Sequence, residues 1–88
     1  MPERTVQIVN KAGLHARPAA EIVKVAAKYA SDITVTREEL EVNGKSIMGV
    51  MMLAAECGSS ITIRADGPDA AQAVEALAQL VADGFGEE

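Results

Sequence analysis

Residues 60–81, SITIRADGPDAAQAVEALAQLV, decide the fold, because the spacing of their apolar side chains changes once along the segment. Over 60–65 every second residue is apolar, which predicts a strand with one buried face. The turn-forming sequence DGP follows, and from residue 70 the apolar residues recur at helical spacing. Asp69 and Gln72 have the spacing of a capping box at the start of this helix. The side chains expected to face the core are Ile61, Ile63, Ala65, Ala70, Ala73, Val74, Leu77, Leu80 and Val81.

Three further segments show the alternation of a strand. They are RTVQIV at 4–9, DITVT at 32–36 and ELEV at 39–42. The last two are separated by polar residues, which predicts a β-hairpin. The side chains expected to point inward from these strands are Val6, Ile8, Ile33, Val35, Leu40 and Val42.

Two more segments have helical character. SIMGVMMLA, residues 46–54, fits a short helix with Ser46 as its N-cap, although Gly49 costs about 1 kcal/mol relative to alanine. The preceding Asn43-Gly44 pair is also typical of a hairpin turn, but the unbranched residues behind it favour the helix. The second helical segment is 19–30, and its charged residues lie opposite an apolar face that contains Ala19, Ile22, Val23, Ala26 and Ala27.

The resulting order is β-α-β-β-α-β-α within one domain spanning residues 1–88, since a chain of this length has room for one core. We expect an α+β fold with a single, mostly antiparallel sheet and all helices on one face. The tail, 83–88, is expected to fray unless Phe85 packs back. The other face of the sheet is expected to contact water through Thr5, Gln7, Thr34, Thr36, Thr62 and Arg64.

Charge and composition exclude several classes of function. A net charge of −5 argues against a general binder of nucleic acids or anionic membranes. The longest apolar run, 47–55, is far shorter than the roughly 20 residues that span a bilayer, and the N-terminal sequence lacks the pattern of a signal peptide. Cys57 is the only cysteine and no zinc-ligand spacing is present, so we expect no metal, no cofactor and a cytoplasmic location.

His15, the only histidine, lies where a helix must begin. Pro18 has no N–H and fits only the first turn, so the helix is expected to start between residues 15 and 18. Backbone N–H groups of Ala16 and Arg17, the Arg17 guanidinium and the helix dipole would hold an anion beside the imidazole. An uncharged imidazole can act as a covalent nucleophile, and a phosphoryl group is the electrophile that suits this site. Gly13 gives the backbone before it unusual conformational freedom.

The arrangement, rather than the histidine itself, favours a functional site. A lone histidine is commonly a surface residue without a role, whereas Gly-x-His-x-Arg-Pro at a helix start is a specific combination. No metal-ligand set or glycine-rich phosphate loop accompanies it, so we expect the site to accept a phosphoryl group and to hydrolyse it poorly. An acylphosphatase-like hydrolase is disfavoured, because Asn10 and Arg4 are present without a cradle of glycines.

The motifs GLHARPA (13–19) and KSIMGVMML (45–53) resemble those of the HPr family, the histidine-containing phosphocarriers of the bacterial phosphoenolpyruvate-dependent sugar phosphotransferase system. The resemblance covers essentially the whole chain. It implies an open-faced β-sandwich with strand order 1-4-2-3 and three helices. It also implies that Enzyme I phosphorylates His15 on Nδ1 and that the group passes to a histidine of an EIIA-type domain. Arg17 matches the arginine that helps to neutralise the phosphate.

The resemblance extends to regulation and partners. Ser46 matches the serine that HPr kinase/phosphorylase modifies in many Gram-positive and some other bacteria, and a transcriptional regulator is a further implied partner. In this role the protein is a monomeric, stoichiometric carrier rather than an enzyme. A nitrogen- or carbon-regulatory phosphotransfer branch without sugar transport is the alternative function.

The second helix is expected to carry the docking surface, because so short a helix cannot bury all its sides. Val50 and Leu53 are expected in the core, and Met52 is left open between core and surface. Flexible methionine side chains suit a surface that must fit several partners. Lys11 and Arg17 are expected to form part of a positive rim that attracts acidic partner surfaces. The expected contact residues are Ile47, Met48, Met51, Ala20 and Lys45, the last also belonging to the rim.

Overall fold

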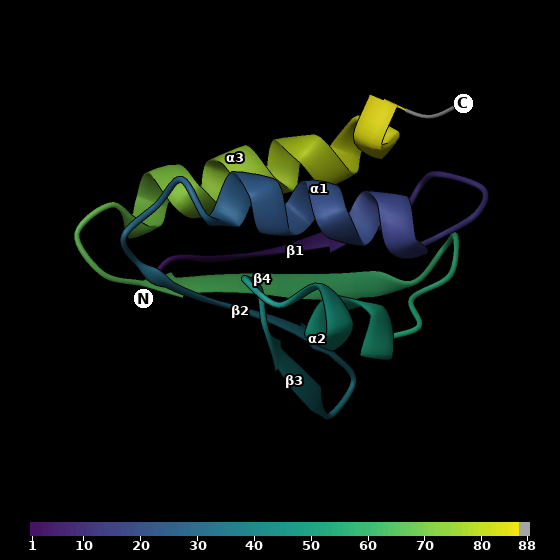
Figure 1. Ribbon diagram of the computed structural model, residues 1–88, viewed down its shortest axis with the longest axis horizontal. Coiled ribbons are helices and arrows are strands. Elements are labelled where there is room, and N and C mark those ends of the chain that lie inside the picture. Colours follow the sequence, from purple (N-terminus) through teal and green to yellow (C-terminus); the bar gives the residue numbers. More distant parts are fainter. Residues whose placement is uncertain (87–88) are drawn as a thin grey trace.

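A computed structural model of the chain describes residues 1–86 and shows helices packed over a sheet (Figure 1). The predicted order of strands and helices is confirmed, with a short 3-10 turn added after the last helix. The elements are β1 (Glu3–Gln7), α1 (Ala16–Ala26), β2 (Asp32–Arg37), β3 (Leu40–Asn43), α2 (Ile47–Met52), β4 (Ser60–Asp66), α3 (Ala70–Ala82) and η1 (Gly84–Gly86).

The four strands form one antiparallel sheet in the order β1-β4-β2-β3, as the resemblance to HPr implies. Helices α1 and α3 lie side by side over one face of this sheet (Figure 1). The shorter α2 packs against α1 and β3. The strand alternation makes this arrangement possible, because it gives the sheet one apolar face for the helices to cover.

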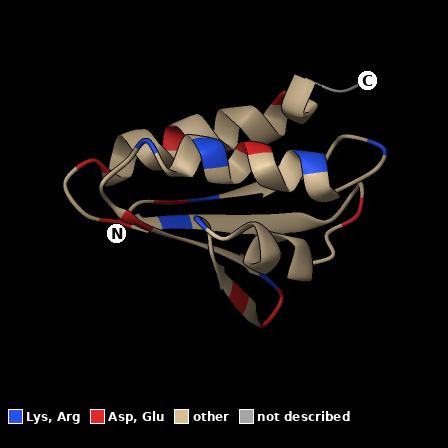
Figure 2. Cartoon of the chain, in the orientation of Figure 1, with Lys and Arg blue, Asp and Glu red and all other residues tan. Residues whose placement is uncertain are grey.

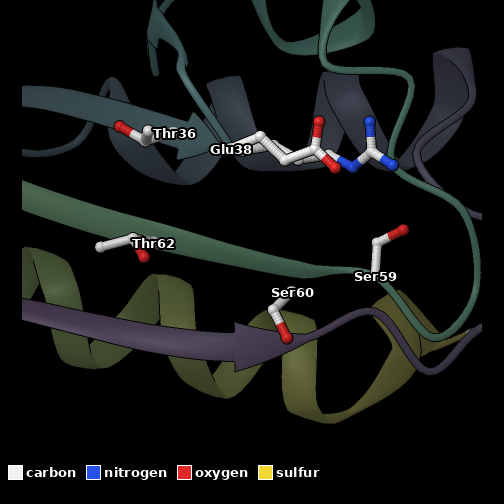
Figure 3. A pocket seen from close by; sticks show the side chains of 6 residues that line it. Thr36, Glu38, Ser59, Ser60 and Thr62 are labelled. Atoms are coloured by element: carbon white, nitrogen blue, oxygen red, sulfur yellow. The ribbon is translucent and has the colours of Figure 1, made fainter.

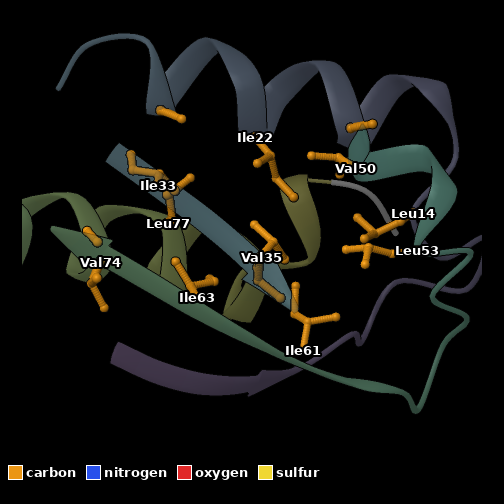
Figure 4. Close-up of a cluster of buried hydrophobic side chains, with 14 of the residues drawn as sticks. Leu14, Ile22, Ile33, Val35, Val50, Leu53, Ile61, Ile63, Val74 and Leu77 are labelled. Atoms are coloured by element: carbon orange, nitrogen blue, oxygen red, sulfur yellow. The ribbon is translucent and has the colours of Figure 1, made fainter. Parts of the chain in front are cut away.

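The core lies between the helices and the sheet (Figure 4). Ile33 and Val35 of β2 and Ile61 and Ile63 of β4 are each at most 2% exposed. The alternate strand residues on the other face are exposed or half-buried, as expected of a face that contacts water. The side chains that the helices add to the core include Ala19, Ile22, Val50, Ala73, Val74, Leu77 and Val81.

Two inward assignments made from the sequence are wrong. Ala27 is exposed, because α1 ends at Ala26 instead of continuing to residue 30. Leu40 is 42% exposed although its pairing with Arg37 places it on the helix-covered face. It begins the edge strand next to the hairpin turn, at a corner of the sheet beyond the buried core, and alternation alone cannot show how far the core extends.

The C-terminal tail is ordered further than expected. Residues 84–86 form the 3-10 turn η1, and the half-buried Phe85 packs against the core. The expected alternative, that Phe85 packs back, is therefore confirmed, and this part of the tail does not fray. Residues 87 and 88 lie outside the described residues.

Asp69 fastens the end of α1 to the start of α3, and it does not form the predicted capping box. Its carboxylate accepts hydrogen bonds from the amides of Ala30 and Ser31 and from the Ser31 hydroxyl, over 2.9, 3.0 and 2.5 Å. Gly67 allows this approach, because a Cβ there would lie 2.6 Å from Ser31 Oγ. The Ser31 hydroxyl, followed by the Ala30 amide, holds the pKa of Asp69 below its ordinary value of 3.8.

Asp69→Asn should lower the free energy of unfolding at pH 7. The asparagine side chain is uncharged and has one acceptor oxygen, so it cannot replace the carboxylate in all three hydrogen bonds. A carboxyl whose pKa is lower in the folded than in the unfolded state stabilises the fold above the unfolded pKa. This contribution is lost as the pH falls through the folded-state pKa. Urea unfolding should therefore show a difference between wild type and variant that is constant near neutrality and shrinks below pH 4.

Asp66→Asn, which removes the same charge at the end of β4, is the control and should show a smaller effect at pH 7. An Asp69→Asn difference that stays the same at pH 3 and pH 7 would contradict the charged acceptor.

Candidate functional site

His15 is the N-cap of α1. Its backbone is extended (φ −84°, ψ −171°), the helix begins at Ala16, and the amide of Ala19 donates to the His15 carbonyl over 3.0 Å. Pro18 lies in the first turn and is buried, as its missing N–H requires. The predicted helix start is thus confirmed. His15, Ala16 and Arg17 are all exposed, so the electropositive end of α1 faces solvent beside the imidazole.

A tight turn held by Asn10 places His15 there. The Asn10 side-chain amide donates to the Gly13 carbonyl over 2.9 Å, and the Gly13 amide donates to the Asn10 carbonyl over 3.1 Å. The His15 amide donates to the same Gly13 carbonyl over 3.0 Å. Asn10 is only 2% exposed. Sequence reasoning missed this role, although an asparagine three residues before a glycine is a turn signal.

Gly13 brings the first motif against the segment that follows α2. It has φ +72°, and a Cβ built on it would lie 2.6 Å from the Ala55 carbonyl oxygen. The next residue, Leu14, donates its amide to that same oxygen over 2.9 Å. Because no other residue type fits both the conformation and the space, Gly13 fixes the start of α1 onto the end of α2.

The second motif presents an apolar surface. Ser46 caps α2, and its Oγ accepts from the Gly49 amide over 3.0 Å, as predicted. Val50 and Leu53 are buried, which confirms their place in the core. Met52 is 64% exposed, so it belongs to the surface. The expected contact residues are also accessible, with exposed fractions of 43% for Ile47, 74% for Met48 and 39% for Met51.

Charge around this surface is uneven. Helix α2 carries no charged side chain, whereas basic residues lie on the loop before α1 and on α1 itself (Figure 2). Lys11 and Arg17 are exposed, and Ala20 is half-buried. Lys45 Nζ donates to the Tyr29 carbonyl over 2.8 Å, beyond the C-terminal end of α1. Since α1 has 11 residues and is about 16 Å long, Lys45 is remote from His15.

Two hollows of the surface border the turn between β2 and β3, at Arg37 and Glu38. One of about 480 Å³ lies over the end of β2 and the start of β4, where Thr36, Glu38, Ser59, Ser60 and Thr62 surround it (Figure 3). Among residues 1–86, no three His, Cys, Asp or Glu side chains come together as a metal site. In the same part of the chain, no helix has the length and hydropathy that crossing a membrane requires.

Comparisons with known proteins agree with this geometry. The family described as the PTS HPr component phosphorylation site matches residues 2–83. The phosphocarrier protein HPr of Cupriavidus necator is 47% identical over 87 residues, which cover 99% of this chain and 98% of that protein.

Solved structures are similar over their whole length. A crystal structure of HPr from Thermoanaerobacter tengcongensis has a TM-score of 0.95 and 46% identity, and covers 100% of this chain and 99% of that one. A second structure, of an HPr dimer from the same organism, has a TM-score of 0.79 and 46% identity, and covers 99% and 100%. Family, fold and sequence agree along the chain, which therefore belongs to the HPr family of phosphocarrier proteins of the bacterial phosphotransferase system.

Proposed function

We propose that His15 carries the phosphoryl group, accepting it on Nδ1 from phosphorylated Enzyme I and passing it to a histidine of an EIIA-type domain. The observation that carries this proposal is the exposed His15 at the N-cap of α1, where two backbone amides have no acceptor within the helix. The protein then acts as a stoichiometric carrier in the cytoplasm, where its partners would work.

The proposed transfer needs few groups from this chain. Nδ1 of His15 attacks phosphorus, and a new P–N bond forms while the P–N bond to the donor histidine breaks and its electron pair stays on the donor ring. The amides of Ala16 and Arg17 and the Arg17 guanidinium would neutralise the oxygens. Each 1.4 kcal/mol of extra stabilisation would shift the transfer equilibrium about tenfold, so a few exposed donors suit a group that must leave again.

The surface formed by Ile47, Met48, Met51 and Met52 is the proposed docking surface. It is apolar and exposed, and the contact between Gly13 and Ala55 ties the end of α2 to the His15 turn. Partners with an apolar patch and an acidic border would match it and the nearby Arg17. The expected monomeric state and the role of Lys45 as a contact residue stay predictions.

Ser46 is the proposed site of regulation by HPr kinase/phosphorylase. Its hydroxyl is half-buried in the cap of α2 and lies next to Ile47 and Met48. A phosphate there would carry about two negative charges and sit favourably at a helix N-terminus, but it would border the docking surface. Weaker docking of Enzyme I, with little change of fold, is the expected consequence.

His15→Ala should abolish phosphorylation. Incubated with Enzyme I and phosphoenolpyruvate, wild type should gain one acid-labile phosphoryl group and the variant none, as measured by mass spectrometry before and after acid treatment. The variant should unfold at nearly the same urea concentration as wild type, because the replaced ring is exposed. Phosphate retained by a folded His15→Ala protein would contradict the proposed function.

Gly13→Ala should both destabilise the fold and slow transfer. We expect a loss of about 2 kcal/mol in urea unfolding, because alanine is strained at positive φ and its Cβ would press on the Ala55 carbonyl. The shifted turn should slow single-turnover transfer from Enzyme I about tenfold. Gly58→Ala is the matched control, since Gly58 has φ +96° and open space around it. Equal slowing in both variants would show that the Ala55 contact is irrelevant.

Ser46→Asp and Ser46→Ala should separate charge from capping. Aspartate still caps α2 and adds a charge, whereas alanine loses the cap at a cost of about 1 kcal/mol and adds none. We expect Ser46→Asp to keep near wild-type stability and to raise the KM of Enzyme I for this protein. Ser46→Ala should lower the stability and leave that KM unchanged. Transfer to Ser46→Asp at the wild-type rate would contradict the proposed regulation.

A further inference from the structure

The segment after α2 supports the His15 turn and is itself held from two sides. On one side the Leu14 amide donates to the Ala55 carbonyl over 2.9 Å. On the other side Arg37 Nη1 donates to the Leu53 carbonyl over 3.2 Å. Leu53 and Ala55 are 2% and 3% exposed, so their side chains are fixed in the core. Only Ala54 separates the two carbonyls, so a shift of the Leu53 carbonyl would pass along the backbone to the Ala55 carbonyl and from there to the turn.

The residue between these two anchors is strained. Ala54 has φ +50°, a left-handed conformation that residues with a Cβ adopt reluctantly. Such a conformation persists where neighbouring contacts hold it in place. The anchors on either side of Ala54 are the carbonyls that Arg37 and Leu14 bind. Loss of one anchor should let this turn relax and carry the Ala55 carbonyl with it.

The hairpin brings Arg37 to this position. Arg37 ends β2 on the same face as Ile33 and Val35, which is the face that the helices cover. Its pairing with Leu40 across the turn fixes its backbone. The side chain is half-buried, and with Leu53 and Ala54 it lines a hollow of about 480 Å³ between the hairpin and the end of α2. Its guanidinium therefore faces the end of α2.

We propose that Arg37 is a positioning residue for phosphoryl transfer at His15, acting through the Leu53 carbonyl and the turn at Ala54 and Ala55. The proposal rests on the function proposed above. A guanidinium bound to a carbonyl at a helix C-terminus is a charge-assisted hydrogen bond and also opposes the negative end of the helix. Arg37 makes no contact with the phosphoryl group in this scheme; it keeps in place the support that sets the position of His15.

Three variants test this role. Arg37→Met keeps an aliphatic side chain and removes every donor, whereas Arg37→Gln keeps a neutral donor. Arg64→Met is the control: it makes the same replacement at an arginine whose Nε donates to Glu3. Amide hydrogen exchange at Leu14 reports on the turn, and single-turnover transfer from phosphorylated Enzyme I separates the maximal rate from KM. Urea unfolding establishes that each variant is folded.

We expect Arg37→Met to speed exchange at Leu14 and to lower the maximal transfer rate about three- to tenfold, with KM within about twofold of wild type. Arg37→Gln should recover most of the rate, and Arg64→Met should match wild type in both measurements. Unchanged exchange at Leu14 would overturn the proposal. A rise in KM alone would also overturn it, because Arg37 would then be a docking charge.

A wild-type protein that takes no phosphoryl group from Enzyme I would overturn the proposed function separately. Exchange at Leu14 would then still decide whether Arg37 holds the turn, since that measurement needs no phosphoryl transfer.

Discussion

The contact between Gly13 and the Ala55 carbonyl is the constraint on which the rest of the site depends. A carbonyl oxygen that would lie 2.6 Å from a Cβ leaves room for glycine alone, and the φ of +72° restricts the position to glycine a second time. The Leu14 amide then uses the same oxygen as its acceptor. The start of α1 is thereby joined to the segment after α2, which ties the histidine to the helix that carries the apolar surface although some thirty residues separate them in sequence.

What could be read from the sequence is what local chemistry dictates. Pro18 can stand only in a first turn, so it predicts the helix start at His15. Ser46 before a run rich in unbranched residues predicts a capped helix, and the alternation in 60–65 predicts which side chains β4 buries. Each of these conclusions depends on residues within about four positions of one another, and each agrees with the structure.

What could not be read depends on partners far along the chain. Asp69 has the spacing of a capping residue, yet its carboxylate accepts hydrogen bonds from the amides of Ala30 and Ser31 instead. Lys45 Nζ donates to the Tyr29 carbonyl, an acceptor that the sequence around residue 45 does not indicate, and its role as a contact residue stays a prediction. Nothing in the sequence around Arg37 indicates a partner for its side chain. Only the position of the hairpin beside the end of α2 gives its guanidinium an acceptor. Periodicity indicates which face a residue occupies, but it does not identify the hydrogen-bond partner that its side chain finds there.

The division of labour among the helices explains how the fold tolerates so much exposed apolar surface on α2. Helices α1 and α3 each bury one face and supply most of the core side chains that come from helices, whereas α2 contributes Val50 within the helix and Leu53 at its end. Burying a side chain such as that of Met48 contributes roughly 1.5–3 kcal/mol of favourable free energy. Folding leaves this side chain exposed, so binding of a partner over it would supply that contribution. A charge placed at Ser46 would act on this surface and on a six-residue helix, while the core beneath α1 and α3 would be unaffected. The fold thus keeps the exposed apolar surface of α2 apart from the core that α1 and α3 cover.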